Sequence, residues 1–209
     1  EQEQEQQEGE NQQHDVVAGF PSVVEGTALL CPDDDIDTDG IFAGAHTYKH
    51  AMTPAEMACV VMENYDPRFA ALVRSGDVLV AGHNFGCGSS REQAATALKA
   101  VGIRMVVAAS FSQTFQRNGF NNALICVECP ELACTLRRRY TVADADGRAS
   151  GARSVRTGDM LRVDFHSSHA VLVGDSGEQT FSFRPLGPAV QRLIACGGLL
   201  PWVSRELNL

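Results

Sequence analysis

Short apolar runs alternate with segments of helical periodicity between residues 22 and 128, and this alternation constrains the fold more than any other feature of the sequence. The runs with strand character are 22–31, 77–82, 103–109 and 123–128. The segments with helical periodicity are 54–65, 90–102 and 112–120. Strands that alternate with helices form a parallel sheet covered by helices. The sequence therefore predicts an α/β fold with parallel strand pairing.

A different pattern follows between residues 140 and 185. Turn signals occur there at 144–147 (DADG), 156–159 (RTGD) and 174–178 (GDSGE). Short alternating runs lie at 160–165, 170–174 and 180–183, which predicts β-hairpins. We expect one last helix between Pro188 and the pair Gly197-Gly198, because Pro is common at the first helical position and Gly just past the end.

The first 15 residues differ in composition from the rest of the chain. They hold almost no apolar side chains, six acidic residues and no Lys or Arg. Such a segment buries too little apolar surface to offset the entropy of ordering it. We therefore expect a disordered Glu/Gln-rich tail or linker over residues 1–15 and one domain over residues 16–209.

The charge balance limits the kinds of partner. The formal charge of the chain is −9, but it is only −3 once the six acids of the tail are left out. A nearly neutral domain gives no reason to expect a nucleic-acid surface or a basic membrane-binding face. No apolar run reaches the roughly 20 residues that a membrane-spanning helix needs, and the first residues lack the pattern of a signal peptide. We expect a soluble protein with no nucleic acid and no membrane as partner. Because it begins with Glu rather than Met, we also expect a preceding segment.

Residues 83–98, HNFGCGSSREQAATAL, lead from a glycine-rich turn into a helical pattern. One interpretation is a capping box at the helix start, formed by Ser89 with Glu92 or by Ser90 with Gln93. The other is an anion pocket built from the amides of the first helical turn, the two hydroxyls and a guanidinium.

Two features favour the anion pocket. Capping does not need the spaced glycines Gly82, Gly86 and Gly88, which let a backbone come close to a bound group. Arg91 in the first turn opposes the helix dipole unless an anion lies in front of it. The Lys of a phosphate loop and the dinucleotide fingerprint G-x-G-x-x-G are both absent. We therefore expect a carboxylate as the ligand.

Several motifs together resemble one known family. They are NFGCGSSREQA, DIDTDGI, MENYD, RNGFNNAL and GGLLPWV. Over residues 18–206 the chain resembles the small, swivelling domain of the aconitase superfamily. Within it, the motifs are most similar to fungal homoaconitase, and next to the small subunit of isopropylmalate isomerase. The resemblance implies a swivelling β/β/α three-layer domain.

The resemblance also implies a reaction and a set of site residues. Members of the superfamily remove and re-add water across adjacent carbons of a hydroxy-acid. Ser89 would be the base that takes the carbon-bound proton, with its alkoxide stabilised by first-turn amides and by Arg91. Arg91 would also bind a substrate carboxylate, Ser90 would help to orient it, and Asp39 would form part of the site wall.

One position departs from the pattern of the family. Relatives carry a basic residue where this chain has Ala45, and that residue would meet a substrate carboxylate. Either His46 or Lys49 replaces it, or the substrate preference has changed. His46 is our candidate for this contact.

Other polar clusters have simpler interpretations. The acids around Asp39 could form a solvated turn or a calcium loop, but the later Glu and the flanking helices of an EF-hand are not evident. His166 and His169 fit a hairpin end, and Asn118, Asn121 and Asn122 fit capping and turn roles. The resemblance adds that the loop with these asparagines faces the active cleft, where they could support the site. The run Arg137, Arg138 and Arg139 fits a solvated helix face, and Cys87 fits a small residue that lines the turn.

The seven cysteines are an odd number in a chain too long to need disulfides, which indicates a reducing compartment. Cys126 and Cys129 have a metal-ligand spacing, with Cys134 nearby, but Cys126 lies in an apolar strand pattern where a free thiol packs as a small hydrophobe. We expect no metal ligands in this chain. The resemblance implies a [4Fe–4S] cluster held by a large partner domain or subunit, where it acts as a Lewis acid on the substrate.

Three functions are compatible with these observations. The first is homoaconitate hydratase of the α-aminoadipate pathway of lysine biosynthesis, with this chain as a separate subunit or as the end of a longer one. The second is the small subunit of isopropylmalate isomerase, and the third is a non-catalytic module that binds a tri- or dicarboxylate. The resemblance to fungal enzymes implies the mitochondrial matrix, and the sequence without it implies the cytoplasm.

Overall fold

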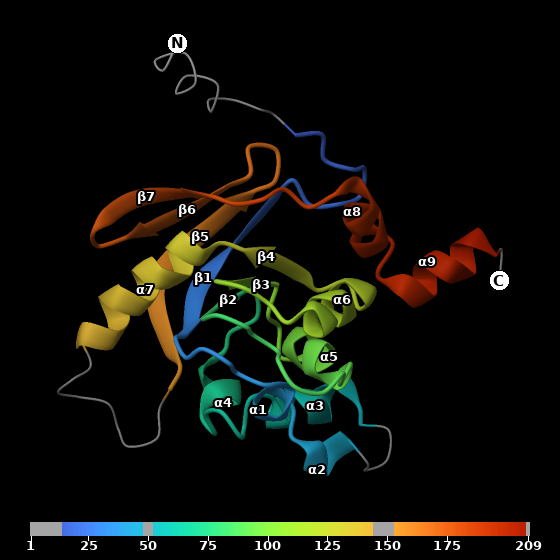
Figure 1. The fold of residues 1–209 in the computed structure, drawn as a ribbon, viewed down its shortest axis with the longest axis horizontal. Coiled ribbons are helices and arrows are strands. Elements are labelled where there is room, and N and C mark those ends of the chain that lie inside the picture. The colour runs from blue at the N-terminus through green and yellow to red at the C-terminus, as the bar shows by residue number, and fades with distance from the viewer. Residues whose placement is uncertain (1–13, 48–51, 144–152, 208–209) are drawn as a thin grey trace.

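The structure, a computed structural model, describes residues 14–47, 52–143 and 153–207. Its centre is a seven-stranded mixed sheet with the strand order β4-β3-β2-β1-β5-β6-β7 (Figure 1). Strands β1 to β4 pair in parallel, whereas β5 pairs antiparallel with β1, β6 with β5, and β7 with β6. The strands are β1 Val23–Cys31, β2 Val78–Ala81, β3 Met105–Ala108, β4 Ile125–Glu128, β5 Val155–Asp164, β6 His169–Gly174 and β7 Gly177–Ser182. The predicted parallel half and the predicted hairpins are both confirmed.

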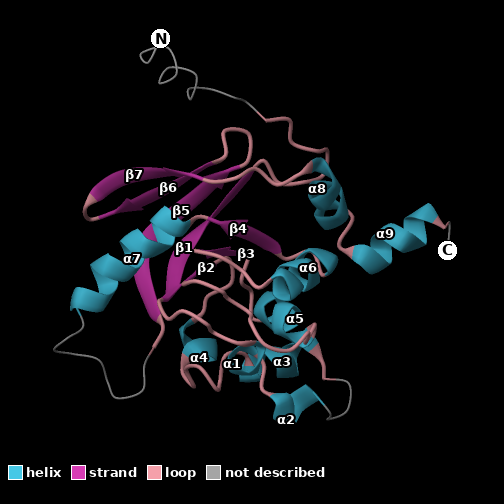
Figure 2. Cartoon of the chain, viewed as in Figure 1, coloured by secondary structure: helices cyan, strands magenta, loops and turns pink. Residues whose placement is uncertain are grey.

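The helices lie mainly below and beside the sheet in Figure 2. They are α1 Thr38–Ile41, α2 Gly44–Thr47, α3 Pro54–Val60, α4 Phe69–Leu72, α5 Gln93–Ala100, α6 Gln113–Asn121, α7 Pro130–Ala143, α8 Pro188–Ala195 and α9 Leu199–Glu206. The helix expected over 54–65 ends early, because Met62 has a positive φ of 60° and donates its amide to Ile41. None of the helices in the described part of the chain is long and apolar enough to cross a membrane.

Two hydrophobic clusters fill the opposite faces of the parallel strands. Successive strand residues point to opposite faces. Leu29 and Leu79 therefore pack with α5 and α6 in one cluster. Leu30 and Val80 pack in the other cluster with α7 and with buried residues of the antiparallel strands, such as Leu161. The antiparallel half thus curls over one face of the parallel half while helices cover the other, which confirms the expected β/β/α layering.

One predicted turn is wrong. Residues 156–159 do not reverse the chain but lie inside β5. The pairing of β1 with β5 shifts register between Thr27 and Leu29, and Gly158 has a φ of +84° opposite this irregularity. The glycine therefore serves a β-bulge rather than a turn. The turn expected at 174–178 does close the β6–β7 hairpin, and the one at 144–147 lies outside the described residues.

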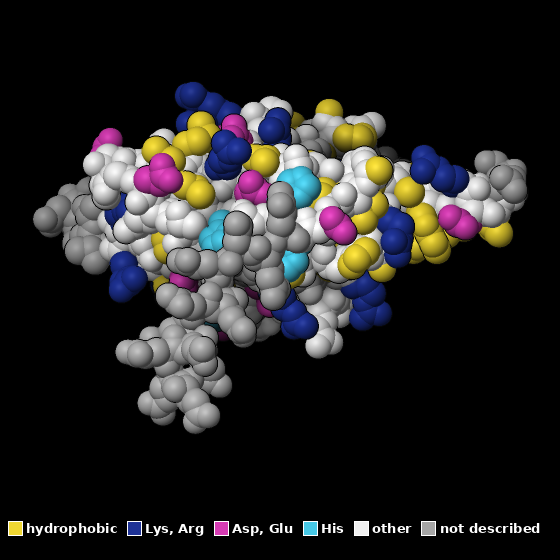
Figure 3. Space-filling model, turned by 90° about the horizontal axis from the view of Figure 1, so that it is seen from above, with side chains coloured by type: hydrophobic (Ala, Val, Ile, Leu, Met, Phe, Trp, Pro, Cys, Tyr) yellow, Lys and Arg dark blue, Asp and Glu magenta, His cyan; other side chains and the backbone are white. Residues whose placement is uncertain are grey.

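The last helix, α9, was not predicted and extends away from the body of the molecule (Figure 1). None of its residues is buried, and its side chains include large exposed apolar ones. Hydrophobic side chains gather at this end of the surface in Figure 3. The exposed apolar residues here are Leu199, Leu200, Trp202 and Leu207. Gly197 and Gly198 precede this helix and Pro201 lies in its first turn, so the local sequence indicates the end of a helix there rather than the start of one.

A buried carboxylate joins the two halves of the fold. Asp66, with 1% of its surface exposed, accepts the amides of Arg68 at 3.0 Å, Arg153 at 3.0 Å and Ser154 at 2.8 Å. Burial alone would raise the pKa of Asp66, but these three donors outweigh it and hold the pKa below its usual range. Asp66 therefore fixes the start of β5 against the turn before α4.

Replacing Asp66 with Asn should lower the free energy of unfolding by about 2 kcal/mol at pH 7, because an amide offers fewer acceptors to three buried donors. The carboxylate has a lower pKa in the folded state, so its stabilisation is complete above the unfolded pKa of about 4 and is lost as the pH falls through the folded value. The wild-type and Asp66→Asn chains should therefore differ less at pH 3 than at pH 7. Urea unfolding followed by circular dichroism at both pH values measures this, and an equal difference at both would contradict it.

Candidate functional site

Three loops leave the carboxyl ends of neighbouring parallel strands and meet at one edge of the sheet. They are 32–37 after β1, 82–92 after β2 and 109–112 after β3. The amide of Gly86 donates to Ile36 at 2.8 Å, and the amide of Thr38 donates to Cys87 at 2.9 Å. The loop after β2 also bonds to the loop after β3. Because this edge is where open parallel sheets bind ligands, the loop that carries Ser89 lies in a suitable place for a site.

The structure shows why glycine occupies three positions of this loop, which the sequence alone did not reveal. A Cβ on Gly82 would lie 2.5 Å from the Asp33 carbonyl oxygen, and a Cβ on Gly86 would lie 2.2 Å from the ring of Phe115. Gly86 and Gly88 also have positive φ angles of 76° and 87°. Close packing therefore accounts for Gly82 and Gly86, and backbone conformation for Gly86 and Gly88. The close approach of a ligand, expected from their spacing, stays a prediction.

The start of α5 contradicts the capping box. The helix begins at Gln93 with Glu92 as its N-cap, and no side chain caps it. The amides of Ala94 and Ala95 donate to the carbonyls of Arg91 and Glu92, so these two first-turn amides are not available to Ser89. The expected stabilisation of a Ser89 alkoxide by the first helical turn therefore loses two of its donors.

Ser89 and Ser90 are instead both exposed. The Ser89 hydroxyl lies 2.8 Å from the hydroxyl of Thr38, which is 2% exposed. The Ser90 carbonyl accepts the Asn118 side-chain amide at 3.2 Å. The two serine side chains therefore remain accessible at the sheet edge while their backbone is held in place.

Arg91 is fixed by an ion pair rather than by the helix. Its Nη1 donates to Asp39 Oδ1 at 2.7 Å and to the Phe42 carbonyl at 3.1 Å. Asp39 also accepts the Gly44 amide at 2.9 Å and the Asn64 side-chain amide at 3.0 Å. The Gly44 amide, and then the Arg91 guanidinium, hold the pKa of Asp39 below its usual range. The anion expected in front of Arg91 is thus provided by the chain itself, and the structure brings Asp39 and Arg91 together.

Gly44 is needed for this arrangement. A Cβ at this position would lie 3.0 Å from Arg91 Nη2 and 3.1 Å from Asp39 Oδ1. The guanidinium of Arg91 therefore packs directly against the backbone of Gly44, with no room for a side chain between them. Sequence reasoning did not single out Gly44, because nothing in its local pattern indicates a side chain from residue 91.

His46 lies on the same edge, near Ala45, which is exposed. Its Nε2 lies 2.5 Å from Glu63 Oε1, so the ring already has a carboxylate partner within the chain. A substrate carboxylate at His46 would compete with Glu63. Lys49, the other candidate, lies outside the described residues.

Two asparagines at the end of α6 fix the loop from the other side. Asn118 binds the Ser90 carbonyl, and the Asn122 side-chain amide donates to Glu92 Oε1 at 2.8 Å. Lys99 in turn contacts the Asn122 carbonyl. We predicted capping and turn roles for these asparagines and, from the resemblance, a loop that faces the active cleft. The structure places two of them in contact with the Ser-Ser-Arg-Glu segment.

The acidic loop after β1 is hydrogen-bonded to the loop that carries Ser89. Asp34 accepts the His83 amide at 2.8 Å, and Asp35 accepts the Asn84 side-chain amide at 2.7 Å. The His83 amide, and then Arg137, hold the pKa of Asp34 below its usual range. Arg137 and Arg139 form ion pairs with Asp34 at 2.9 Å and Asp159 at 2.8 Å. The Arg137 side chain is 44% exposed, as expected for a solvated helix face, whereas that of Arg139 is only 21% exposed and lies against a buried carboxylate.

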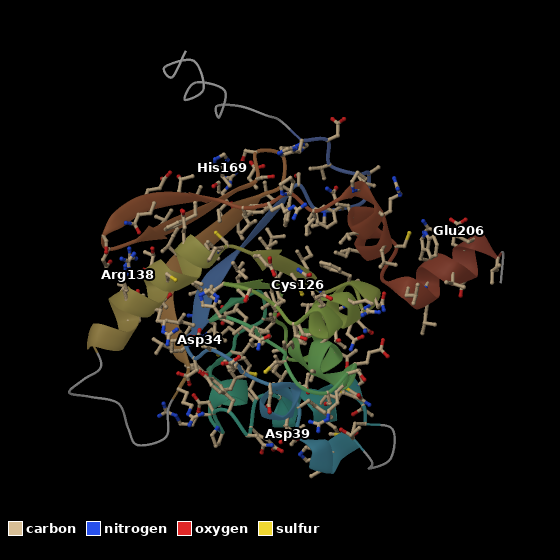
Figure 4. All side chains as sticks on the ribbon, in the orientation of Figure 1. Asp34, Asp39, Cys126, Arg138, His169 and Glu206 are labelled. Carbon is tan, nitrogen blue, oxygen red and sulfur yellow. The ribbon has the colours of Figure 1, made fainter. Side chains whose placement is uncertain are left out.

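The remaining metal candidates do not converge. Cys126 packs in the cluster on the helical side of the sheet, whereas Cys129 packs in the cluster on the other side. His169 lies at the opposite end of the molecule from Asp39 in Figure 4. Within the described ranges, no group of three or more His, Cys, Asp or Glu side chains could hold a metal ion.

Cys87 lies two residues before Ser89 but is not poised as a nucleophile. Burial, and then the carboxylates of Asp37 and Asp35, raise the pKa of the Cys87 thiol. The thiol donates a hydrogen bond to the Asp35 carbonyl oxygen at 3.4 Å. A neutral, hydrogen-bonded thiol is weakly reactive.

Alkylation should therefore separate the cysteines. Cys59 and Cys134 are exposed and should react first with iodoacetamide at pH 8, Cys87 should react slowly, and the buried Cys31 and Cys126 should not react in the folded chain. Burial raises the pKa of Cys31 to about 12 and that of Cys126 still further. Peptide mass spectrometry of a time course measures the order. Labelling of Cys87 before Cys59 would contradict a raised pKa.

Comparison with known proteins gives a consistent result. Residues 1–132 match the family model of the aconitase C-terminal domain. The chain is 46% identical over 204 residues to a protein named "Homoaconitase, mitochondrial" from Chaetomium globosum, covering 97% of this chain and 25% of that protein. It is 42% identical to the protein of the same name from Candida albicans, covering 93% of this chain and 28% of that protein. The chain thus spans about a quarter of the length of the curated relatives it matches.

A solved structure extends the similarity to three dimensions. The crystal structure of 3-isopropylmalate dehydratase from Methanocaldococcus jannaschii superposes with a TM-score of 0.70 at 30% sequence identity. The match covers 89% of this chain and 96% of the other. Since the family model covers more than half of the chain and the relatives align over nearly all of it, the chain belongs to the aconitase C-terminal domain family.

Proposed function

We propose that this chain supplies the proton-abstracting serine and the carboxylate-binding arginine of a hydro-lyase, homoaconitate hydratase of lysine biosynthesis. The observation that carries the proposal is the state of Ser89. It is exposed at the carboxyl edge of the sheet, has no capping role, and lies two residues from an arginine fixed by its own ion pair. The names of relatives at 42% to 46% identity support homoaconitate as the substrate.

In this proposal Ser89 moves the proton. Its oxygen, as an alkoxide, takes the proton from a substrate carbon, and the electron pair of the broken C–H bond forms the carbon–carbon double bond. The bond between the adjacent carbon and its hydroxyl oxygen breaks, the electron pair leaves with the oxygen, and a proton from solvent or from an acid of the partner region converts it to water. The reverse steps, with water added to the other carbon, complete the isomerisation.

Arg91 positions the substrate in this scheme. Nη1 is occupied by Asp39 and Phe42, while the guanidinium retains further N–H groups for a substrate carboxylate. Asp39 keeps the guanidinium oriented in the absence of substrate. Ser90 and His46 are the additional contacts that we propose for the carboxylates, and the Glu63 partner of His46 would have to share or release the ring.

We infer that the metal chemistry belongs to a partner region. A [4Fe–4S] cluster, when bound, would supply a Lewis acid for the substrate hydroxyl. The described residues do not fit a cluster, since they bring no three ligand side chains together. Its ligands would therefore lie in a large partner domain or subunit, and the quarter-length coverage of the relatives supports this division. The names of those relatives support the mitochondrial matrix as the location.

The match to 3-isopropylmalate dehydratase supports a second candidate, the small subunit of isopropylmalate isomerase. Homoaconitate and isopropylmalate offered to one preparation of the complete enzyme discriminate the two, since the preferred acid will have the higher kcat/KM. Binding of tricarboxylates without turnover of either acid would instead identify a non-catalytic module.

Replacing Ser89 with Ala should lower kcat in the complete enzyme by about 10²- to 10⁴-fold, the usual contribution of a general base. Hydration of homoaconitate, followed by the absorbance of the unsaturated acid, measures the loss. Ser75→Ala, which changes another exposed serine on a different loop, is the matched control. Wild-type activity of the Ser89→Ala enzyme would rule out the proposed role.

Replacing Arg91 with Lys should raise KM by about 10-fold or more, because a lysine cannot bind Asp39, Phe42 and a substrate carboxylate in one plane. Initial rates over a range of substrate concentrations give KM and kcat separately. Arg138→Lys on the exposed side of α7 is the control and should leave both unchanged. An unchanged KM in the Arg91→Lys enzyme would assign the carboxylate to another residue.

A further inference from the structure

We propose that Thr38 is a positioning residue for the reaction, whose hydroxyl donates a hydrogen bond to the Ser89 oxygen and stabilises it as an alkoxide. The inference rests on the proposed role of Ser89 as base. It starts from the distance of 2.8 Å between the two hydroxyl oxygens, which join loops 51 residues apart in the sequence.

Thr38 is held rigidly. It is 2% exposed, its amide donates to the Cys87 carbonyl at 2.9 Å, and its carbonyl accepts the Phe42 amide at 2.9 Å. Asp37 caps the same short helix by accepting the Gly40 amide at 2.7 Å. A β-branched side chain with a fixed backbone has little rotamer freedom. The Thr38 hydroxyl is therefore pre-oriented, and no reorganisation is needed when charge develops on its neighbour.

The direction of the bond follows from the chemistry. Two neutral hydroxyls can share a bond either way, but an alkoxide has no proton and can only accept. When Ser89 is ionised, Thr38 must be the donor. Hydrogen bonds of this O–H···O⁻ type are shorter and about twice as strong as neutral ones. The contact should therefore strengthen when Ser89 carries the charge.

The surroundings of Ser89 favour such a donor. The amides of Ala94 and Ala95 are already paired within the start of α5. The acids Asp37 and Asp39 flank Thr38 in the chain, and a negative charge nearby disfavours an alkoxide. Arg91 offsets part of this, but its Nη1 is bound to Asp39. Thr38 is a pre-oriented donor that the structure places directly against the Ser89 oxygen.

The test compares hydroxyl-deleted and hydroxyl-retaining variants of the complete, cluster-loaded enzyme. Thr38→Val and Thr38→Ala remove the donor, and Thr38→Ser keeps it. Thr157→Val is the matched control. The Thr157 hydroxyl also joins segments distant in sequence, since it donates to the Ala28 carbonyl at 2.9 Å, but it lies away from the site. Far-ultraviolet circular dichroism and the thermal midpoint identify variants that fold, and Thr38→Ala serves where valine is too bulky.

We expect kcat to fall by about 10²- to 10³-fold in the deleted variants, the usual loss of one preorganised donor, with KM changed by less than about threefold. The kinetic isotope effect for substrate deuterated at the abstracted position should increase, since proton abstraction becomes slower than product release. Thr38→Ser should restore most of kcat. A merely structural role would leave the isotope effect unchanged.

The outcomes separate this inference from the proposed function. An inactive Ser89→Ala enzyme together with a folded, fully active Thr38→Ala enzyme would overturn the role of Thr38 alone. A fully active Ser89→Ala enzyme would overturn both. Equal losses in Thr38→Ser and Thr38→Ala would also overturn the inference, because the hydroxyl would then not be the group that matters.

Discussion

The parallel pairing of β1 with β2 is the constraint on which the rest of the site depends. In register, Cys31 pairs with Ala81, so the two strands end together and their following loops run side by side. The Gly86–Ile36 and Thr38–Cys87 hydrogen bonds continue that pairing beyond the strands. Without it, Ser89 and Thr38, which are distant in sequence, would not share a hydrogen bond. The helices on one face and the curled antiparallel strands on the other stabilise this edge. Helices also contribute side chains to it, among them Asp39 of α1, Asn118 of α6 and Arg137 of α7.

Charge at the edge is arranged by local pairing. Asp34 and Asp35 of the loop after β1 accept hydrogen bonds from the loop after β2. Asp39, in the following helix α1, orients Arg91 instead. Each carboxylate therefore has partners inside the chain, and the low pKa of Asp34 and of Asp39 follows from backbone donors before it follows from arginines. A cluster that looks like a calcium loop in the sequence is thus satisfied by amides and a guanidinium. The same pairing leaves Arg91 with only part of its hydrogen-bonding capacity for a ligand.

The local sequence was sufficient to predict most of the strands, the helices α5, α6 and α8, and the hairpin turn at 174–178. Their hydrophobic periodicity and their terminal residues depend on interactions between residues close in the chain. The local sequence gave wrong predictions where a contact with a distant segment determines the structure. Gly158 looks like a turn residue but serves a bulge set by the partner strand, and Ser89 looks like a cap although Glu92 is the N-cap. The motifs were enough to name Ser89, Arg91 and Asp39 as candidates, and the structure places the last two in contact. Gly44, Glu63 and Thr38 were missed as neighbours of these residues because each contact joins separate loops.

The geometry also explains two glycines that lie beside the site. Gly44 has no side chain because the guanidinium of Arg91 lies over it, and Gly86 has none because the Phe115 ring lies against it. A change at either position would move a loop and not merely lose a contact. The hydroxyl of Thr38 is buried beneath an exposed serine, where a water molecule would otherwise solvate the Ser89 oxygen with no fixed orientation. In the role proposed for Ser89, a fixed donor in place of mobile water would stabilise the alkoxide, and the loop pairing that begins with β1 and β2 would hold that donor in position.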